Sequence, residues 1–120
     1  IPVNVVVEGD TEGRIRNAFS EVFTKAGFRT GNNRSRYVMN VKITVSPVEM
    51  KSPNKFSRYV VDASLVDTAD NTVLIPYSIN GREGHATQPE ADVRAIRAAE
   101  NTIKSDFAEK LAGYLSSATS

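Results

Sequence analysis

The only histidine of the chain, His85, stands in the stretch "REGHATQPEA". Histidine is the side chain that gains or loses a proton near neutral pH, so His85 is a candidate general base. A catalytic triad or a metal site would need partners from other parts of the fold, and the sequence singles out neither a serine nor a pair of carboxylates for that role. We therefore interpret His85 as a solvent-exposed loop residue, with a small hydrolase built around it as an alternative.

Cysteine is absent from the sequence. This absence excludes disulfide bonds, thiolate metal ligands and cysteine nucleophiles. Because no other cluster of reactive side chains stands out, we expect no cofactor, no metal ion and no enzymatic activity.

The stretch "VVVEGDTEGRIRNAF" places two glycines between a β-branched run and a helical pattern, as a phosphate-binding loop does. A Walker loop ends in Gly-Lys-Ser/Thr, and the dinucleotide fingerprint has three glycines in close order. The segment "EGDTEGR" has neither pattern, and its acids Glu8, Asp10 and Glu12 would repel a phosphate. We predict instead that Asp10 or Thr11 caps the helix that follows.

Positive charge is concentrated between Arg29 and Arg58, a segment with seven basic residues and one acid. Since the whole chain carries a formal net charge of +1, this segment is at +6 and the remainder at −5. Most of these basic residues fall in two loops, "RTGNNRSR" and "KSPNKFSR", with aromatic residues nearby. Such loops suit single-stranded nucleic acid, an anionic lipid head group or an acidic protein surface, and ordinary solvated loops are the plain alternative. The residues that we predict to bind a partner are Arg34, Arg36, Tyr37, Lys51, Lys55, Phe56 and Arg58.

Alternation of apolar and polar residues predicts four strands, at residues 3–8, 37–46, 59–65 and 72–80. Pro76 lies inside the fourth, which argues for a sheet edge or a bulge there. The segment "DTADN" before it is typical of a turn, because Asp and Asn bond their own backbone. We interpret "SPVEMKSPNK" as a long hairpin loop between the second and third strands.

Two helices are predicted from apolar stripes and capping signals. The first has the stripe Ile15, Phe19, Val22 and Ala26, and Gly27 ends it. The second begins at a capping box formed by Thr87 and Glu90, has Pro89 in its first turn, and runs to about Leu115. Its predicted stripe is Val93, Ile96, Ala99, Ile103, Phe107, Leu111 and Tyr114, and the closing "SSATS" is predicted to fray.

The element order β-α-β-β-β-α predicts an α/β (α+β) fold, a two-layer sandwich whose mixed four-stranded sheet carries both helices on one face. This order does not match the RRM fold, and no aromatic-rich RNP-like strand occurs, so nucleic acid is not the favoured partner. A chain of 120 residues forms one domain, 1–120, which we expect to be excised from a longer precursor. The open face of the sheet is predicted to carry Asn40, Lys42, Thr44, Asp62, Ser64, Ser78 and Asn80.

Three phrases resemble a known class of small domains: "AFSEVFTKAGFRT", "YVVDASLVDTADNTVL" and "GHATQPEADVRAIRAAENTIKSDFAEKL". The class comprises domains of bacterial envelope lipoproteins, namely the curli-secretion-type, flagellar-assembly and penicillin-binding-protein-activator lipoproteins, and the amino-terminal domain of the Tol-system translocation protein. The resemblance spans Val3 to Leu115, with departures at "SRY", where Arg36 replaces an expected acid, and at "DTADNT", which lacks a glycine.

The resemblance implies a non-catalytic periplasmic module, anchored to the outer membrane through an upstream lipid or domain. It would dock on other envelope proteins, on peptidoglycan or on an anionic membrane surface, and a homo-oligomer is a further option. No catalytic residue is carried over from the class.

Overall fold

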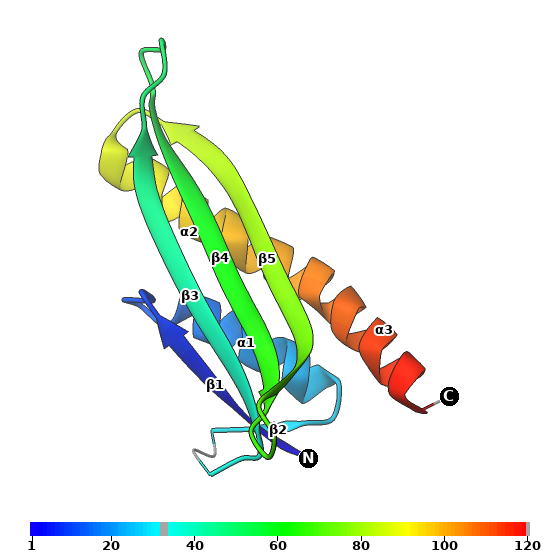
Figure 1. Cartoon of the computed structure of the whole chain (residues 1–120). Helices are drawn as coiled ribbons and strands as arrows, with labels where there is room; N and C mark the ends of the chain where they lie inside the picture. Colours follow the sequence, from blue (N-terminus) through cyan, green and yellow to red (C-terminus); the bar gives the residue numbers. More distant parts are fainter. Residues whose placement is uncertain (32–33, 120) are drawn as a thin grey trace.

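Five strands and two long helical segments form the part of the chain that the computed structural model describes, residues 1–31 and 34–119 (Figure 1). The strands are β1 (Pro2–Glu8), β2 (Arg29–Thr30), β3 (Tyr37–Val48), β4 (Lys55–Asp67) and β5 (Thr72–His85). The first helix is α1 (Arg14–Lys25). The second is continuous through α2 (Gln88–Thr102), a π-helical turn (Ile103–Phe107) and α3 (Ala108–Thr119).

The sheet has the strand order β2-β1-β3-β4-β5. β1 is parallel to both of its neighbours, whereas β3, β4 and β5 are joined as antiparallel hairpins. The predicted mixed α/β sheet is confirmed, but the prediction of four strands was wrong, because β2 is a fifth. β2 has only two residues, with the Arg29 N–H donating to the Ile1 carbonyl oxygen at 3.0 Å. So short a strand has no alternation that a sequence pattern could reveal.

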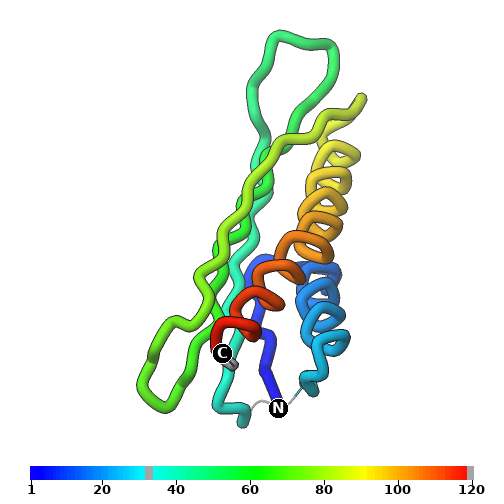
Figure 2. Tube along the Cα trace, turned by 90° about the vertical axis from the view of Figure 1, so that its right-hand side faces the viewer, coloured from blue at the N-terminus to red at the C-terminus, as the bar shows by residue number. Residues whose placement is uncertain are grey.

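Both helical segments cover the same face of the sheet, as the side view in Figure 2 shows. The core lies between the two layers, and its largest fully buried side chains include Phe19, Phe23, Phe107, Ile15 and Met39. The residues predicted for the opposite face are exposed there, except that Ser64 is half-buried. Among the described residues, none of the helices combines the length and the apolar character needed to cross a membrane.

The helix α1 is closed at both ends by signals that the sequence carries. The Asp10 carboxylate accepts the N–H groups of Ile15 and Arg16, at 3.3 and 2.9 Å, so the predicted cap by Asp10 is confirmed. At the other end, Gly27 has a φ of +94° and the Phe28 N–H donates to the Phe23 carbonyl oxygen at 2.9 Å. This is the Schellman arrangement that a glycine in the left-handed region permits.

The long C-terminal helix differs from its prediction in length and in the side chains that it buries. Its buried residues follow a spacing of four, at Ala91, Ala95, Ala99, Ile103, Phe107 and Leu111. In a regular α-helix each step of four residues turns the stripe by about 40°, so the stripe would leave the core over several steps. The more loosely wound π-helical turn at Ile103–Phe107 returns it toward the sheet. Val93 of the predicted stripe lies between Ala91 and Ala95, off the buried face, and is 47% exposed. The helix continues to Thr119 instead of ending near Leu115.

The hairpin of β3 and β4 is longer than predicted. Pro47 and Val48 pair with Ser57 and Phe56, so only residues 49–54 form the loop that was predicted to be "SPVEMKSPNK". Its tip projects past the start of α2 at one end of the molecule (Figures 1 and 2).

The turn between β4 and β5 forms as predicted. The Asp67 and Asp70 carboxylates each accept a backbone N–H two residues further on, at 3.0 Å, and Asn71 has a φ of 60°. β5 is an edge strand, which agrees with the prediction from Pro76, and the register shifts beside it between Leu65 and Val66.

Candidate functional site

The two basic loops, which the sequence places on either side of one strand, lie at opposite ends of the structure. They are separated by the 12 residues of β3, which extend over roughly 40 Å at the usual rise of a strand. The longest dimension of the molecule is 51 Å. Arg34, Arg36 and Tyr37 are at the end with the N-terminus, whereas Lys51, Lys55, Phe56 and Arg58 are at the hairpin end (Figure 1). The predicted binding residues thus form two separate groups, and part of the loop "RTGNNRSR" (Asn32 and Asn33) lies outside the described residues.

Arg36, at the N-terminal end, is engaged with the turn between β4 and β5. Its Nε and Nη2 atoms donate to the two carboxylate oxygens of Asp67, each at 2.7 Å, and its guanidinium lies 5.4 Å from the centre of the Tyr37 ring. Its carbonyl oxygen accepts the N–H and the hydroxyl of Thr68, at 2.9 and 2.6 Å. The hydrogen bond from Arg36 lowers the pKa of Asp67, and the same bond raises the pKa of Arg36. Arg36 therefore has a structural role here, whatever it contacts outside the chain.

The Asp67 carboxylate is expected to make the protein sensitive to acid. Its pKa is lower in the folded chain than in the unfolded chain, where it is about 3.9. The stability that the ionised Asp67 carboxylate contributes is therefore complete above its unfolded pKa. It is lost as the pH falls through the pKa of the folded state. Asp67→Asn should lose less of its unfolding free energy on acidification than the wild type, as measured by urea unfolding across the acid range. Glu49→Gln, at the exposed hairpin tip, should keep the wild-type dependence, and an identical acid loss in Asp67→Asn would contradict the prediction.

At the hairpin end, the register of the sheet brings two arginines together. Arg58 of β4 pairs with Arg82 of β5, and both side chains are exposed on the face away from the helices. Two positions along the ladder, in the next pair on the same face, the ring of Phe56 lies over Gly84, where an added Cβ would be 2.5 Å from a ring carbon. The Arg82 guanidinium is 6.0 Å from the centre of the Phe56 ring. Among the described residues, no carboxylate forms an ion pair with Arg58, Arg82, Lys51 or Lys55.

Arg82 is not among the residues that the sequence predicted to bind a partner. It lies in the stretch "NGREGH", 24 positions after Arg58 and outside the basic segment. Charge counting along the chain cannot find it. The only available signal was the register of the hairpin between β4 and β5, and this depends on the turn at residues 68–71 and on the bulge next to it.

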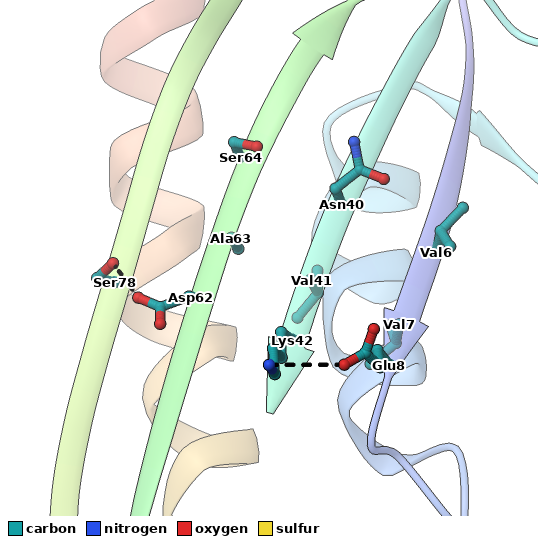
Figure 3. A pocket seen from close by; sticks show the side chains of 10 residues that line it. All are labelled: Val6, Val7, Glu8, Asn40, Val41, Lys42, Asp62, Ala63, Ser64 and Ser78. Carbon is teal, nitrogen blue, oxygen red and sulfur yellow. Dashed lines mark hydrogen bonds and ion pairs between the residues drawn. The ribbon is translucent and has the colours of Figure 1, made fainter. Parts of the chain in front are cut away.

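A shallow hollow of about 470 Å³ lies in the middle of the open face, over β1, β3, β4 and β5 (Figure 3). Its charged side chains are paired within it. Lys42 forms an ion pair with Glu8 at 3.7 Å, and the Ser78 hydroxyl donates to Asp62 at 2.9 Å. The lining mixes these polar groups with four apolar residues, Val6, Val7, Val41 and Ala63, of which Val6 is 44% exposed. Within the described residues no cluster of side chains that could hold a metal ion is found.

His85 does not lie in this hollow. It is the last residue of β5 and not a loop residue, and its side chain is 32% exposed. Its Nδ1 atom lies 2.7 Å from a carboxylate oxygen of Glu90, without the alignment of a hydrogen bond. In the part of the chain that the structure describes, no serine or threonine hydroxyl is hydrogen-bonded to His85. His85 therefore has the Glu90 carboxylate beside it, but among the described residues no hydroxyl nucleophile is bonded to it.

The fold is that of solved bacterial lipoproteins. A minor lipoprotein from Acinetobacter baumannii superposes with a TM-score of 0.60 at 16% identity, over 98% of this chain and 94% of that one. The rare lipoprotein B from Shewanella oneidensis does so with a TM-score of 0.55 at 9% identity, over 99% and 96%. A protein from Xanthomonas campestris superposes with a TM-score of 0.65 at 8% identity, over 99% of this chain and 87% of that one. No protein-family model and no curated protein matches the sequence.

Proposed function

We propose that the protein is a non-catalytic interaction domain of a bacterial envelope lipoprotein, located in the periplasm and anchored to the outer membrane. It docks on other envelope proteins or on the cell wall through the open face of its sheet. The observation that carries the proposal is that the helices cover one face of the sheet while the described chain leaves the other uncovered (Figure 2). The likeness to solved lipoproteins over nearly their whole length supports the envelope location.

The size of the open face suits a protein partner. At the usual spacings of strands and residues, β1, β3, β4 and β5 present roughly 700 Å². This area is close to the roughly 800 Å² that each partner contributes to a standard protein interface. Its polar side chains keep the face soluble when it is unoccupied, and the ion pair of Lys42 with Glu8 leaves hydrogen bonding as the main polar contact that the central hollow offers a partner.

Site-specific photo-crosslinking in the living bacterium tests the docking face. A photoreactive amino acid placed at Asn40, which is exposed in the hollow of the open face, should give a covalent adduct of one defined mass. The matched control is the same amino acid at Thr24, which is exposed on α1. Thr24 should give several times less adduct than Asn40, because α1 lies on the opposite side of the sheet. Equal adducts from the two positions, or an adduct from Thr24 alone, would overturn the proposal.

A further inference from the structure

The cross-strand pair of Arg58 and Arg82 is unfavourable for the fold. Like charges that are directly opposite on neighbouring strands repel each other, and their Cβ atoms are only about 5 Å apart. No described acid forms an ion pair with either arginine, although the same face pairs Lys42 with Glu8. A ligand with concentrated negative charge would convert this repulsion into binding, because two guanidinium groups can together donate several hydrogen bonds to a phosphate.

The packing around Phe56 supports a preformed site. The ring is held over Gly84, and the Arg82 guanidinium lies near it, which restricts the arginine before any ligand binds. On the other side of Arg58, the ladder continues to Ser46 of β3, whose hydroxyl is a further donor at the same level of the sheet. The two arginines are thus displayed in one row that faces solvent.

The hairpin tip above this row combines apolar and basic residues. Met50 is 40% exposed at the tip, Lys51 is exposed in the loop and Lys55 at the start of β4, and Glu49 is the one acid of residues 46–58. The tip lies at one end of the long axis, beyond the start of α2 (Figure 2). It can therefore approach a flat surface without interference from the helices.

We propose that this end of the molecule binds the phosphate groups of anionic lipids on a membrane surface. Arg58 and Arg82 hold a lipid phosphate, Lys51 and Lys55 add attraction to the surface, and Met50 enters the interfacial region. Each basic residue near an anionic membrane strengthens binding by about fivefold. Single-stranded nucleic acid is disfavoured because proteins bind it by stacking its bases on several aromatic side chains. Phe56 packs against Gly84, and Tyr37 is at the other end of β3.

Vesicle co-sedimentation of the full chain tests the proposal. The wild type should sediment with vesicles of mixed phosphatidylglycerol and phosphatidylcholine at low salt, and not with phosphatidylcholine alone. The double variant Arg58→Gln/Arg82→Gln should bind the anionic vesicles at least about tenfold more weakly. Arg16→Gln/Arg29→Gln, which removes the same charge from exposed positions outside the hairpin, should bind like the wild type.

Two further measurements separate the lipid surface from other anions. Met50→Ser should weaken vesicle binding, whereas electrostatic binding to soluble inorganic phosphate or to labelled oligothymidine would not depend on Met50. The double variant should unfold at the wild-type temperature or above it, because its cross-strand repulsion is removed. The proposal is overturned if the wild type fails to sediment, if the double variant binds like the wild type, if Met50→Ser has no effect, or if oligothymidine or phosphate binds more tightly than the vesicles.

Discussion

Replacement of Phe107 by alanine is expected to lower the free energy of unfolding by about 3–5 kcal/mol. The side chain is 0% exposed, and its ring is the meeting point of three structural elements. The ring centre lies 4.9 Å from that of Phe19 and 5.5 Å from that of Phe23, both on α1, and 5.0 Å from that of Tyr77 on β5. Removing the ring loses the free energy gained by burying its apolar atoms. It also leaves a cavity among the neighbouring rings, and this cavity adds a further cost.

Urea unfolding of the wild type and of Phe107→Ala measures this loss directly. Val93→Ala on the same long helix is the control, since Val93 is 47% exposed and its truncation should change stability by about 0.5 kcal/mol or less. A loss below about 1 kcal/mol in Phe107→Ala would show that the π-helical turn does not hold this ring in the core.

The second large effect is expected at Gly9, where the chain leaves β1. Its φ is +90°, and an added Cβ would be 2.2 Å from the carbonyl oxygen of Ile43 in β3. Because that oxygen belongs to the backbone of a central strand, the sheet itself would have to move. We expect Gly9→Ala to lose about 2–5 kcal/mol, from the left-handed backbone and from the overpacking together.

Gly13 provides the matched control for the contact. It has a φ of +78°, but no atom lies within 4 Å of its added Cβ, so Gly13→Ala should lose only the conformational part, about 1–2 kcal/mol. Comparison of the two variants by urea unfolding isolates the clash with Ile43. If the two variants lose the same stability, the close approach of Gly9 to β3 has no energetic consequence.

These glycines also explain the stretch "VVVEGDTEGRIRNAF" without a phosphate. Gly9 lets the chain turn past β3, and Gly13 directly precedes α1. The acid between them, Asp10, occupies the N–H groups of Ile15 and Arg16 that a phosphate would otherwise use. Two of the N–H groups at the helix start are therefore already satisfied by a side chain of the protein itself.

The two ends of the molecule have different electrostatic roles, although both contain residues of one basic segment. At the N-terminal end, Arg36 and Asp67 form a paired contact that fastens the turn between β4 and β5. At the hairpin end, Arg58 and Arg82 have no acidic partner among the described residues. Of the two groups of predicted binding residues, the hairpin group is the one that we propose for an external anion.

The sequence alone determined the features that depend on a few neighbouring residues. Alternation predicted the long strands and the polar face of the sheet, and the signals at Asp10, Gly27 and Thr87 predicted how the helices begin or end. Such signals can be read from the chain because the interactions that satisfy them are made within about six positions.

Only the tertiary structure decided which distant segments meet. Partner strands set the short β2, the extension of the hairpin to Pro47 and the row that joins Arg58 to Arg82, while packing against the sheet required the π-helical turn. These features lie outside local patterns because strand pairing and core packing gain their free energy from residues far apart in sequence, and only the folded chain brings those residues into contact.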